Sequence, residues 1–178
     1  MKEMENKSPT DGKKRNRLRE DILFLLAKIL VFVIVLIIMF KFVFGFVRVR
    51  DMSMKPAIME GDLVLYYRMQ KNFTAGDLLA VEKNGKTEIR RVAAVAGDTV
   101  DINESGLIVN GNLQQESNIY TKTQAYMEGI TFPVTLTGDE VFVLGDKRDS
   151  AEDSRIYGPV SSSAAKGKVV AVFRRRNF

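Results

Sequence analysis

The sequence VRVRDMSMKPAIMEGD covers residues 47–62 and begins where a long run of apolar residues ends. Within it, Ser53 stands between Met52 and Met54, three residues before Pro56. A serine hydroxyl is a poor nucleophile unless a neighbouring group takes its proton. Because the chain contains no histidine and no cysteine, a Ser-His-Asp arrangement, a thiol nucleophile, a disulfide and a histidine-based zinc site are excluded. A hydrolase built on Ser53 therefore needs a different base.

The apolar run before this stretch predicts a membrane-spanning helix over residues 22–47, which read ILFLLAKILVFVIVLIIMFKFVFGFV. At 1.5 Å per residue such a helix is roughly 39 Å long, enough for a bilayer core with some tilt. Its two charges, Lys28 and Lys41, stand near the ends of the most apolar part, from where lysine stems reach the headgroups. The run is too long for a signal peptide and lacks a small-x-small cleavage pattern, so we expect an uncleaved anchor.

The formal net charge of +5 comes partly from basic residues before this run and partly from Arg174 to Arg176. We expect residues 1–21 to be a basic cytoplasmic tail, because positive charge stays inside, and residues 1–20, which are polar and charged, to be disordered. Residues 48–178 are then a single extracellular domain of a single-pass plasma-membrane protein. Nucleic acid is not an expected partner, since basic and aromatic residues do not alternate along the chain.

After residue 48 the pattern changes to short apolar runs separated by glycine and asparagine. Runs rich in Val, Leu and Ile and bounded by turn residues predict strands, here over residues 63–69, 77–83, 87–97, 99–103, 107–111, 140–146 and 168–176. Residues 103–106 predict a hairpin turn, and residues 114–137 a long loop or small insertion. The spacing predicts a mainly β fold, an antiparallel barrel or sandwich.

Three segments of this outer part occur in a recognisable order: SMKPAI at 53–58 followed by Gly61 and Asp62, RRVAAVAGD at 90–98, and GDKRDSAEDSR at 145–155. Together with the single preceding anchor, they resemble the SMxPTL, KRVxGxPGD and GDNRxxSxDSR boxes of the type I signal peptidases. A weaker match, residues 75–79, resembles the family's RGDIV segment. The resemblance covers residues 22–178 and implies the signal peptidase I fold, a β-domain behind one transmembrane helix.

The same resemblance implies roles for individual residues. Ser53 takes the position of the nucleophile, and Arg90 takes that of the general base, where the family has a lysine. Apolar burial makes such a lysine neutral, whereas a guanidinium keeps its proton above pH 12. Ala151 replaces the serine that orients the lysine. Asp51 and Ser53 take the oxyanion-hole positions, and an ionised Asp51 would repel an oxyanion.

Other residues leave alternatives open. The candidates for a substitute base are Lys55, Lys83, Lys86 and Lys147. Lys86 and Arg90 would lie on one face of a strand about 13 Å apart, too far for direct proton transfer. Asp51 assisting Ser53 is a further possibility. We expect a structural charge network to brace the third box, formed by Asp146, Arg148, Asp153 and Arg155.

Two functions follow from the resemblance. The first is a degenerate signal peptidase that binds signal-peptide or pilin segments at the outer membrane face with little or no proteolysis. Signal-peptidase-like proteins with eroded dyads accompany pilus assembly in Gram-positive bacteria, which implies a chaperone-like role with a sortase as partner. The second is an active serine endopeptidase with Ser53 as nucleophile and a substitute base. Neither function needs a cofactor or a metal, and the sequence leaves open whether the chain is an enzyme.

Overall fold

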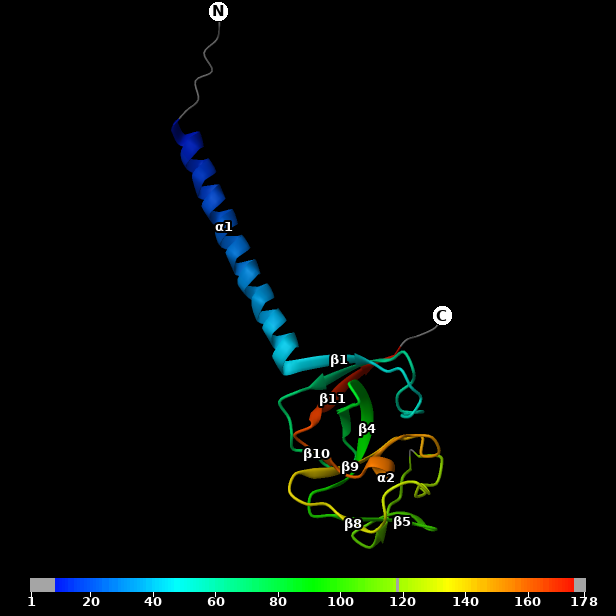
Figure 1. Cartoon of the computed structure of the whole chain (residues 1–178). Coiled ribbons are helices and arrows are strands. Elements are labelled where there is room, and N and C mark those ends of the chain that lie inside the picture. Colours follow the sequence, from blue (N-terminus) through cyan, green and yellow to red (C-terminus); the bar gives the residue numbers. More distant parts are fainter. Residues whose placement is uncertain (1–8, 118, 175–178) are drawn as a thin grey trace, which may run out of the picture. The chain divides into compact units, whose positions relative to one another are not determined.

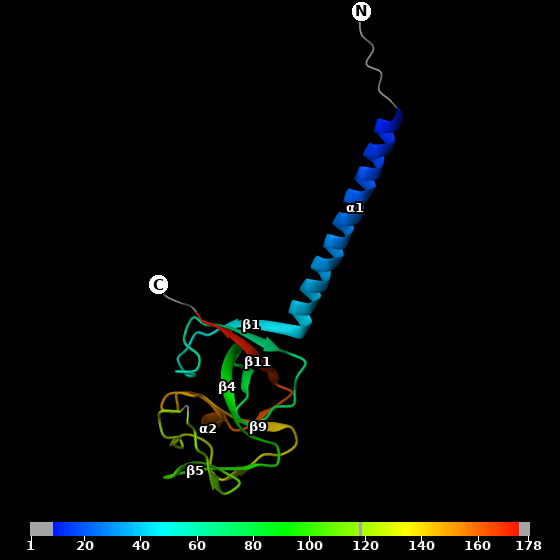
Figure 2. The ribbon, with the colours of Figure 1, turned by 180° about the vertical axis from the view of Figure 1, so that it is seen from behind.

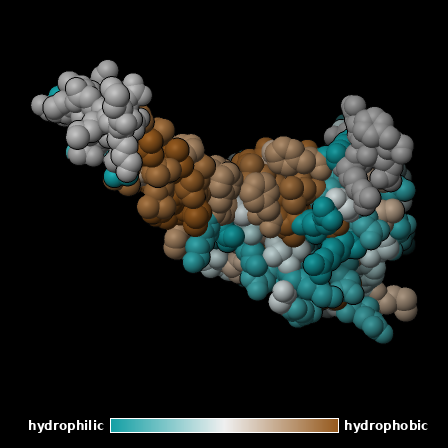
Figure 3. All heavy atoms as spheres, turned by 90° about the horizontal axis from the view of Figure 1, so that it is seen from above, coloured by the Kyte–Doolittle hydropathy of each residue, from teal (hydrophilic) through white to brown (hydrophobic). Residues whose placement is uncertain are grey.

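The structure, a computed structural model, describes residues 9–117 and 119–174, and it divides into two compact units, Met1–Phe42 and Val43–Phe178. In the first unit, helix α1 spans Pro9–Ile38 and continues into a π-helical turn, η1, at Met39–Val43 (Figure 1). Within the described residues, the stretch Arg17–Val43 is the one helical segment long and apolar enough to cross a membrane. Hydrophobic side chains cover this helix (Figure 3), as a membrane span requires.

Both ends of this helix differ from the sequence prediction. Residues 9–20, expected to be disordered, belong to α1, while residues 1–8 lie outside the described part. At the other end, strand β1 spans Phe44–Arg48 and takes the last residues of the stretch predicted as anchor, 44–47. The reason is strand pairing: Phe46 lies opposite Leu65 of β2, so the backbone here bonds to a strand instead of continuing the helix.

The second unit is mainly β and antiparallel, with two sheets in a sandwich-like arrangement instead of a closed barrel (Figures 1 and 2). The seven-stranded sheet has the order β1-β2-β11-β3-β4-β9-β10, and the four-stranded sheet the order β7-β6-β5-β8. The larger sheet also contains β2 Leu63–Tyr67, β3 Leu78–Lys83, β4 Lys86–Val95, β9 Glu140–Leu144, β10 Val160–Ser161 and β11 Ala165–Phe173. The smaller sheet contains β5 Thr99–Asn103, β6 Gly106–Val109, β7 Asn112–Leu113 and β8 Val134–Thr135. A short helix, α2, spans Ser154–Tyr157.

Each apolar run predicted as a strand overlaps one strand of the structure, although β4, β6 and β11 begin one to three residues earlier than predicted. The hairpin turn is also confirmed, because Asn103 and Gly106 face each other at the end of β5 and β6. The sequence missed β1, hidden in the apolar run, and the two-residue strands β7, β8 and β10. Such short strands form by pairing with neighbours and carry no period of their own.

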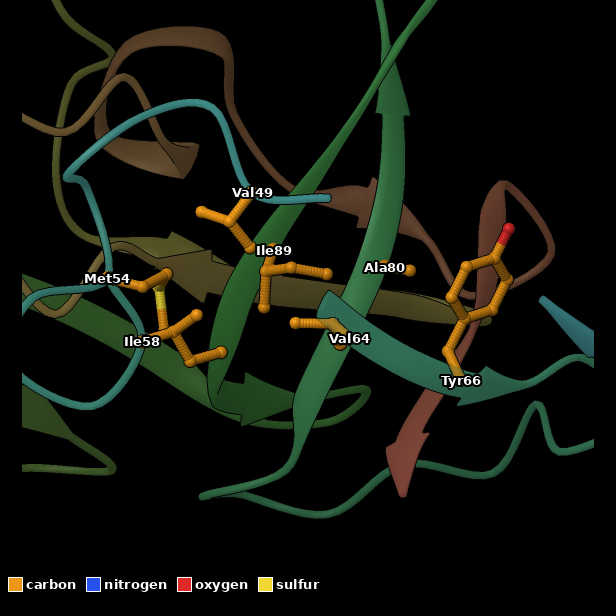
Figure 4. Close-up of a cluster of buried hydrophobic side chains, with 7 residues drawn as sticks. All are labelled: Val49, Met54, Ile58, Val64, Tyr66, Ala80 and Ile89. Carbon is orange, nitrogen blue, oxygen red and sulfur yellow. The ribbon is translucent and has the colours of Figure 1, made fainter. Parts of the chain in front are cut away.

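Three buried clusters hold the second unit together, of which two bear on the site. One lies where the sheets meet, with Val100 and Ile102 of β5 against Phe142 and Leu144 of β9. The other lies beneath the first box and includes Met54, Ile58, Val64 and Ile89. Figure 4 shows Met54 and Ile58 pointing from the loop after β1 toward Ile89 and Val64. Full burial of such side chains stabilises the fold by about 1.5–3 kcal/mol each, which fixes the loop on β4 and β2.

Candidate functional site

Ser53 is held in place by the loop that connects β1 and β2. Two backbone hydrogen bonds close the base of this loop, from the Val49 N–H to the Asp62 carbonyl and from the Gly61 N–H to the Val49 carbonyl, both 2.9 Å. The next side chain along, Met54, is fully buried in the cluster below. Ser53 itself is 8% exposed, so its hydroxyl lies at the edge of the interior, facing β4.

Arg90 of β4 lies directly beside this hydroxyl and is 2% exposed. Its Nη1 donates to Ser53 Oγ at 2.8 Å and to the Ile89 carbonyl at 2.7 Å. Nη2 donates to Glu88 Oε2 and to the Glu152 carbonyl, both at 2.9 Å, and Nε donates to the same carbonyl at 3.1 Å. A guanidinium has five N–H donors, and all five of Arg90 are bonded. The side chain is therefore fixed as a buried cation.

Asp51 binds Ser53 from the other side. The Ser53 hydroxyl donates to Asp51 Oδ1 at 2.6 Å, and the Ser53 backbone N–H donates to the same oxygen at 3.0 Å. An oxyanion hole needs free donors aimed at the developing negative charge. Here the backbone N–H at the oxyanion-hole position is bonded to a carboxylate, so it offers no free donor.

The substitute lysines do not bond the hydroxyl. Among the described residues, Ser53 Oγ has hydrogen bonds only with Arg90 and Asp51. Lys147 contributes its backbone N–H, which donates to the Ser53 carbonyl at 2.8 Å. The Lys83 ammonium lies 3.3 Å from the ring centre of Tyr157. The local geometry thus places a permanent cation, and no amine, against the hydroxyl.

The third box, residues 145–155, packs against the loop that carries Ser53. Gly145 lies so close to the loop that an added Cβ would overlap the Cβ of Ala151 and crowd the Ser53 carbonyl. Ala151 is 1% exposed and offers no hydroxyl. The structure therefore brings together all four positions singled out from the sequence, Ser53, Arg90, Asp51 and Ala151.

Each of the four charged residues expected to brace the third box has a charged partner. Asp153 and Arg155 bind each other at 2.8 Å, and both are almost fully buried. Asp146 pairs with Arg91 at 2.6 Å. Arg148 pairs with Glu116 and also donates to the Gly145 carbonyl and Thr123 Oγ1. One pair, Asp153 with Arg155, lies within the predicted set, while Asp146 and Arg148 take their charged partners from β4 and a distant loop.

Two members of the site were missed by the sequence analysis. Glu88 binds Arg90, and its position two residues earlier on the same strand face was a usable signal. Tyr157 at the end of α2 lies near the same cation, and burial raises the pKa of its hydroxyl to about 12, while Arg90 opposes that rise. Nothing in the local sequence marks Tyr157. Among the described residues, no group of three acidic side chains is arranged to hold a metal ion.

An open cleft of about 520 Å³ lies beside the Ser53–Arg90 pair. One wall comes from β1 and the loop after it, and the other from the β3–β4 turn and the start of β4. The lining residues are Phe46, Val47, Arg48, Arg50, Asp51, Gly85, Lys86, Thr87 and Glu88. Ser53 and Arg90 do not line the cleft themselves, but Asp51 and Glu88, which do, bind them and so connect the cleft to the pair.

Comparison with known proteins places this arrangement in a family. The family model described as signal peptidase, peptidase S26, matches residues 22–174. The chain belongs to the S26 signal peptidase family. The match runs from α1 through the Ser53 loop, β4 and the third box to β11, so it includes every residue of the site.

Two relatives from Bacillus agree with this assignment. The chain is 31% identical over 120 residues to signal peptidase I P of Bacillus subtilis subsp. natto, covering 60% of this chain and 63% of that protein. It is 30% identical over 135 residues to signal peptidase I of Bacillus caldolyticus, covering 68% of this chain and 74% of that protein. A crystal structure of a signal peptidase I from Enterococcus faecalis V583 is similar with a TM-score of 0.47 and 23% identity, covering 56% of this chain and 97% of that one.

Proposed function

We propose that this S26 signal peptidase homologue is membrane-anchored and binds signal-peptide or pilin segments at the outer membrane face with little or no proteolysis. One observation carries the proposal: the side chain against Ser53 Oγ is a buried guanidinium with all five donors bonded. A guanidinium does not release its proton near neutral pH. Arg90 therefore cannot serve as the base that Ser53 would need.

Peptide binding does not depend on that base. A peptide that adds a strand to a sheet edge is held by backbone hydrogen bonds. Strand β4 has a neighbour on each side. On one side β3 pairs with residues 86–91 of β4, whereas on the other side β9 pairs with β4 only from Arg91 onward. Within the described residues, one edge of residues 86–90 therefore has no partner strand, and the start of this stretch lines the cleft. An extended segment has room to pair there, beside Ser53.

The proposal also includes topology and partners. Residues 1–21 form the basic cytoplasmic tail and the anchor begins at residue 22 and ends before β1, so that the β unit is the extracellular domain of a single-pass plasma-membrane protein. The bound segments are signal peptides or pilin precursors, and a sortase that joins pilins is the partner we expect. In that setting the chain acts as an accessory or chaperone in pilus or surface-protein assembly.

The test is cleavage of a pre-protein by the detergent-purified chain, with Ser53→Ala as the control. The third sample is a reverted variant that carries Asp51→Ser, Arg90→Lys and Ala151→Ser together. We expect no cleavage by the unmodified chain, binding of the pre-protein by both the unmodified chain and Ser53→Ala, and cleavage by the reverted variant. Cleavage by the unmodified chain that Ser53→Ala abolishes would refute the proposal.

A second function is favoured by one specific contact. The 2.6 Å hydrogen bond from Ser53 Oγ to Asp51 Oδ1 already directs the hydroxyl proton toward a carboxylate. In an active serine endopeptidase, Asp51 would take that proton as Ser53 attacks the scissile carbonyl. This alternative predicts that Asp51→Asn abolishes cleavage, whereas our proposal predicts that there is no cleavage to lose.

A further inference from the structure

Three basic side chains line the cleft without partners of their own. Arg48, Arg50 and Lys86 are exposed, and none has a hydrogen bond or an ion pair within the part of the chain that the structure describes. The two acidic residues of the cleft are already engaged, Asp51 by Ser53 and Glu88 by Arg90. Arg90 compensates the charge of Glu88, which leaves three cations and one carboxylate, Asp51, to face an occupant, so the net charge of the cleft is positive.

The two arginines are spaced to meet an extended chain. Val49 between them is 7% exposed, and its backbone N–H and carbonyl bond to Asp62 and Gly61. This alternation of exposed, buried and exposed side chains is that of an extended segment. Residues two positions apart in such a segment are about 6.8 Å apart, the same interval that separates alternate side chains of an extended peptide.

We propose that the cleft selects extended peptides with acidic side chains at alternating positions. Such side chains would pair with Arg48 and Arg50 on one wall, with Lys86 facing them from the opposite wall. The inference rests on the proposed function, because it names the class of peptide that the same cleft takes. Lipid headgroups are anionic too, but these cations lie on both walls of a cleft, with Arg48 and Arg50 on one side and Lys86 on the other, a shape that suits an extended chain.

The test uses the full chain in nanodiscs of zwitterionic lipid, with labelled peptides of equal length measured by fluorescence anisotropy. One peptide carries two glutamates separated by one residue, the second carries glutamines there, and the third lysines. A signal-peptide segment serves as the reference. We expect the glutamate peptide to bind about tenfold more tightly than the glutamine peptide, because exposed ion pairs each contribute modestly. The difference should shrink in high salt, which screens such pairs.

Substitutions of the three cleft cations test whether they cause the preference for the glutamate peptide. The triple variant Arg48→Gln/Arg50→Gln/Lys86→Gln should bind glutamate and glutamine peptides equally. Lys86→Gln alone should weaken glutamate binding, whereas Lys122→Gln, with the same charge change at an exposed lysine outside the cleft, should not. Circular dichroism and melting curves show that each variant is folded, and binding of the glutamine peptide checks that its cleft is intact.

The outcomes separate the two proposals. Equal binding of the three peptides by the unmodified chain would overturn the acidic preference and leave the proposed function standing. No binding of any peptide, including the signal-peptide segment, would overturn both. The inference also fails if the affinity of the triple variant for the glutamate peptide is unchanged.

Discussion

At the scale of single residues, the site is organised around Arg90 and its five donors. The Glu152 carbonyl, the Ile89 carbonyl, Glu88 and Ser53 accept all of them. An ammonium has three donors in a different geometry, so a lysine cannot replace this fork. The acceptors around Arg90 are therefore complementary to a guanidinium, and the substitution Arg90→Lys leaves some of them without a hydrogen bond.

This complementarity gives a stability prediction. Arg90→Lys should lower the free energy of unfolding by about 1–3 kcal/mol, because buried acceptors lose their partners. Urea unfolding followed by circular dichroism measures the change. Arg48→Lys, the same substitution at an exposed arginine, is the matched control and should change little. Equal stability of the two variants would contradict the described role of the guanidinium.

Tyr157 gives a prediction about pH. Burial raises the pKa of its hydroxyl to about 12 in the folded chain, against an ordinary value of 10.0. Below pH 10 the hydroxyl is protonated in both states, and its contribution to stability is fully present. Between pH 10 and 12 the unfolded chain releases this proton while the folded chain keeps it, so stability falls as pH rises.

The measurement compares unfolding free energies of the unmodified chain and Tyr157→Phe from pH 9 to pH 12. The variant lacks this titration, so the difference between the two should shift in favour of the variant by about 2–3 kcal/mol over that range. Tyr120→Phe, at a tyrosine that is 83% exposed, should show no such shift. A constant difference across the range would show that Tyr157 titrates normally.

The residues of the site were predictable to different degrees. Ser53, Asp51, Arg90 and Ala151 were identified because the boxes carry them in a fixed order, and the structure brings them together. Glu88 could also have been predicted, because residues two positions apart on a strand lie on the same face and Glu88 precedes Arg90 by two. Tyr157 could not, because only the packing of α2 places its ring near Lys83 and Arg90. The partners of Asp146 and Arg148 also depend on tertiary contacts.

At the scale of elements, the third box is held by the buried pair of Asp153 and Arg155. Asp153 begins α2, accepts from the Arg155 N–H at 3.1 Å and accepts from the Gly145 N–H at 3.0 Å. Through these bonds one carboxylate ties α2 to the end of β9. This connection keeps Gly145 and Ala151 against the Ser53 loop.

Removing the charge of Asp153 should therefore loosen the whole box. Asp153→Asn keeps the size of the side chain but leaves the guanidinium of Arg155 buried without its counter-charge. Loss of one partner of a buried pair costs about 3–5 kcal/mol, measurable by chemical denaturation. Asp149→Asn, an exposed aspartate of the same box, should cost little. A small effect of Asp153→Asn would mean that the pair does not hold the element.

Strands were predicted well where they are long and alternate with turn residues, as in β4 and β5. The start of β1 was not predicted, because Phe44 to Val47 continue the apolar composition of the helix. Composition alone does not separate a helix from a buried strand in such a run. Residues 44–48 form a strand because they pair with β2. The local sequence does not show which segments pair.

At the scale of the whole molecule, the apolar helix and the β unit are two compact parts of one chain. The topology we propose puts the tail inside and the β unit outside. Since the chain has no cysteine, a single introduced cysteine is its one reactive thiol and shows on which side of the membrane that residue lies. Glu104→Cys in the exposed β5–β6 turn should react with an impermeant maleimide on intact cells, whereas Ser8→Cys should react only after permeabilisation. The reverse pattern would refute the topology.

The central claim is that Ser53 is not an activated nucleophile, and covalent labelling tests it most directly. The full chain in detergent is incubated with a serine-reactive fluorophosphonate and analysed by intact mass and peptide mapping, beside Ser53→Ala and the reverted variant Asp51→Ser/Arg90→Lys/Ala151→Ser. We predict no adduct on the unmodified chain and an adduct at Ser53 of the reverted variant. An adduct at Ser53 of the unmodified chain, absent from Ser53→Ala, would contradict the account.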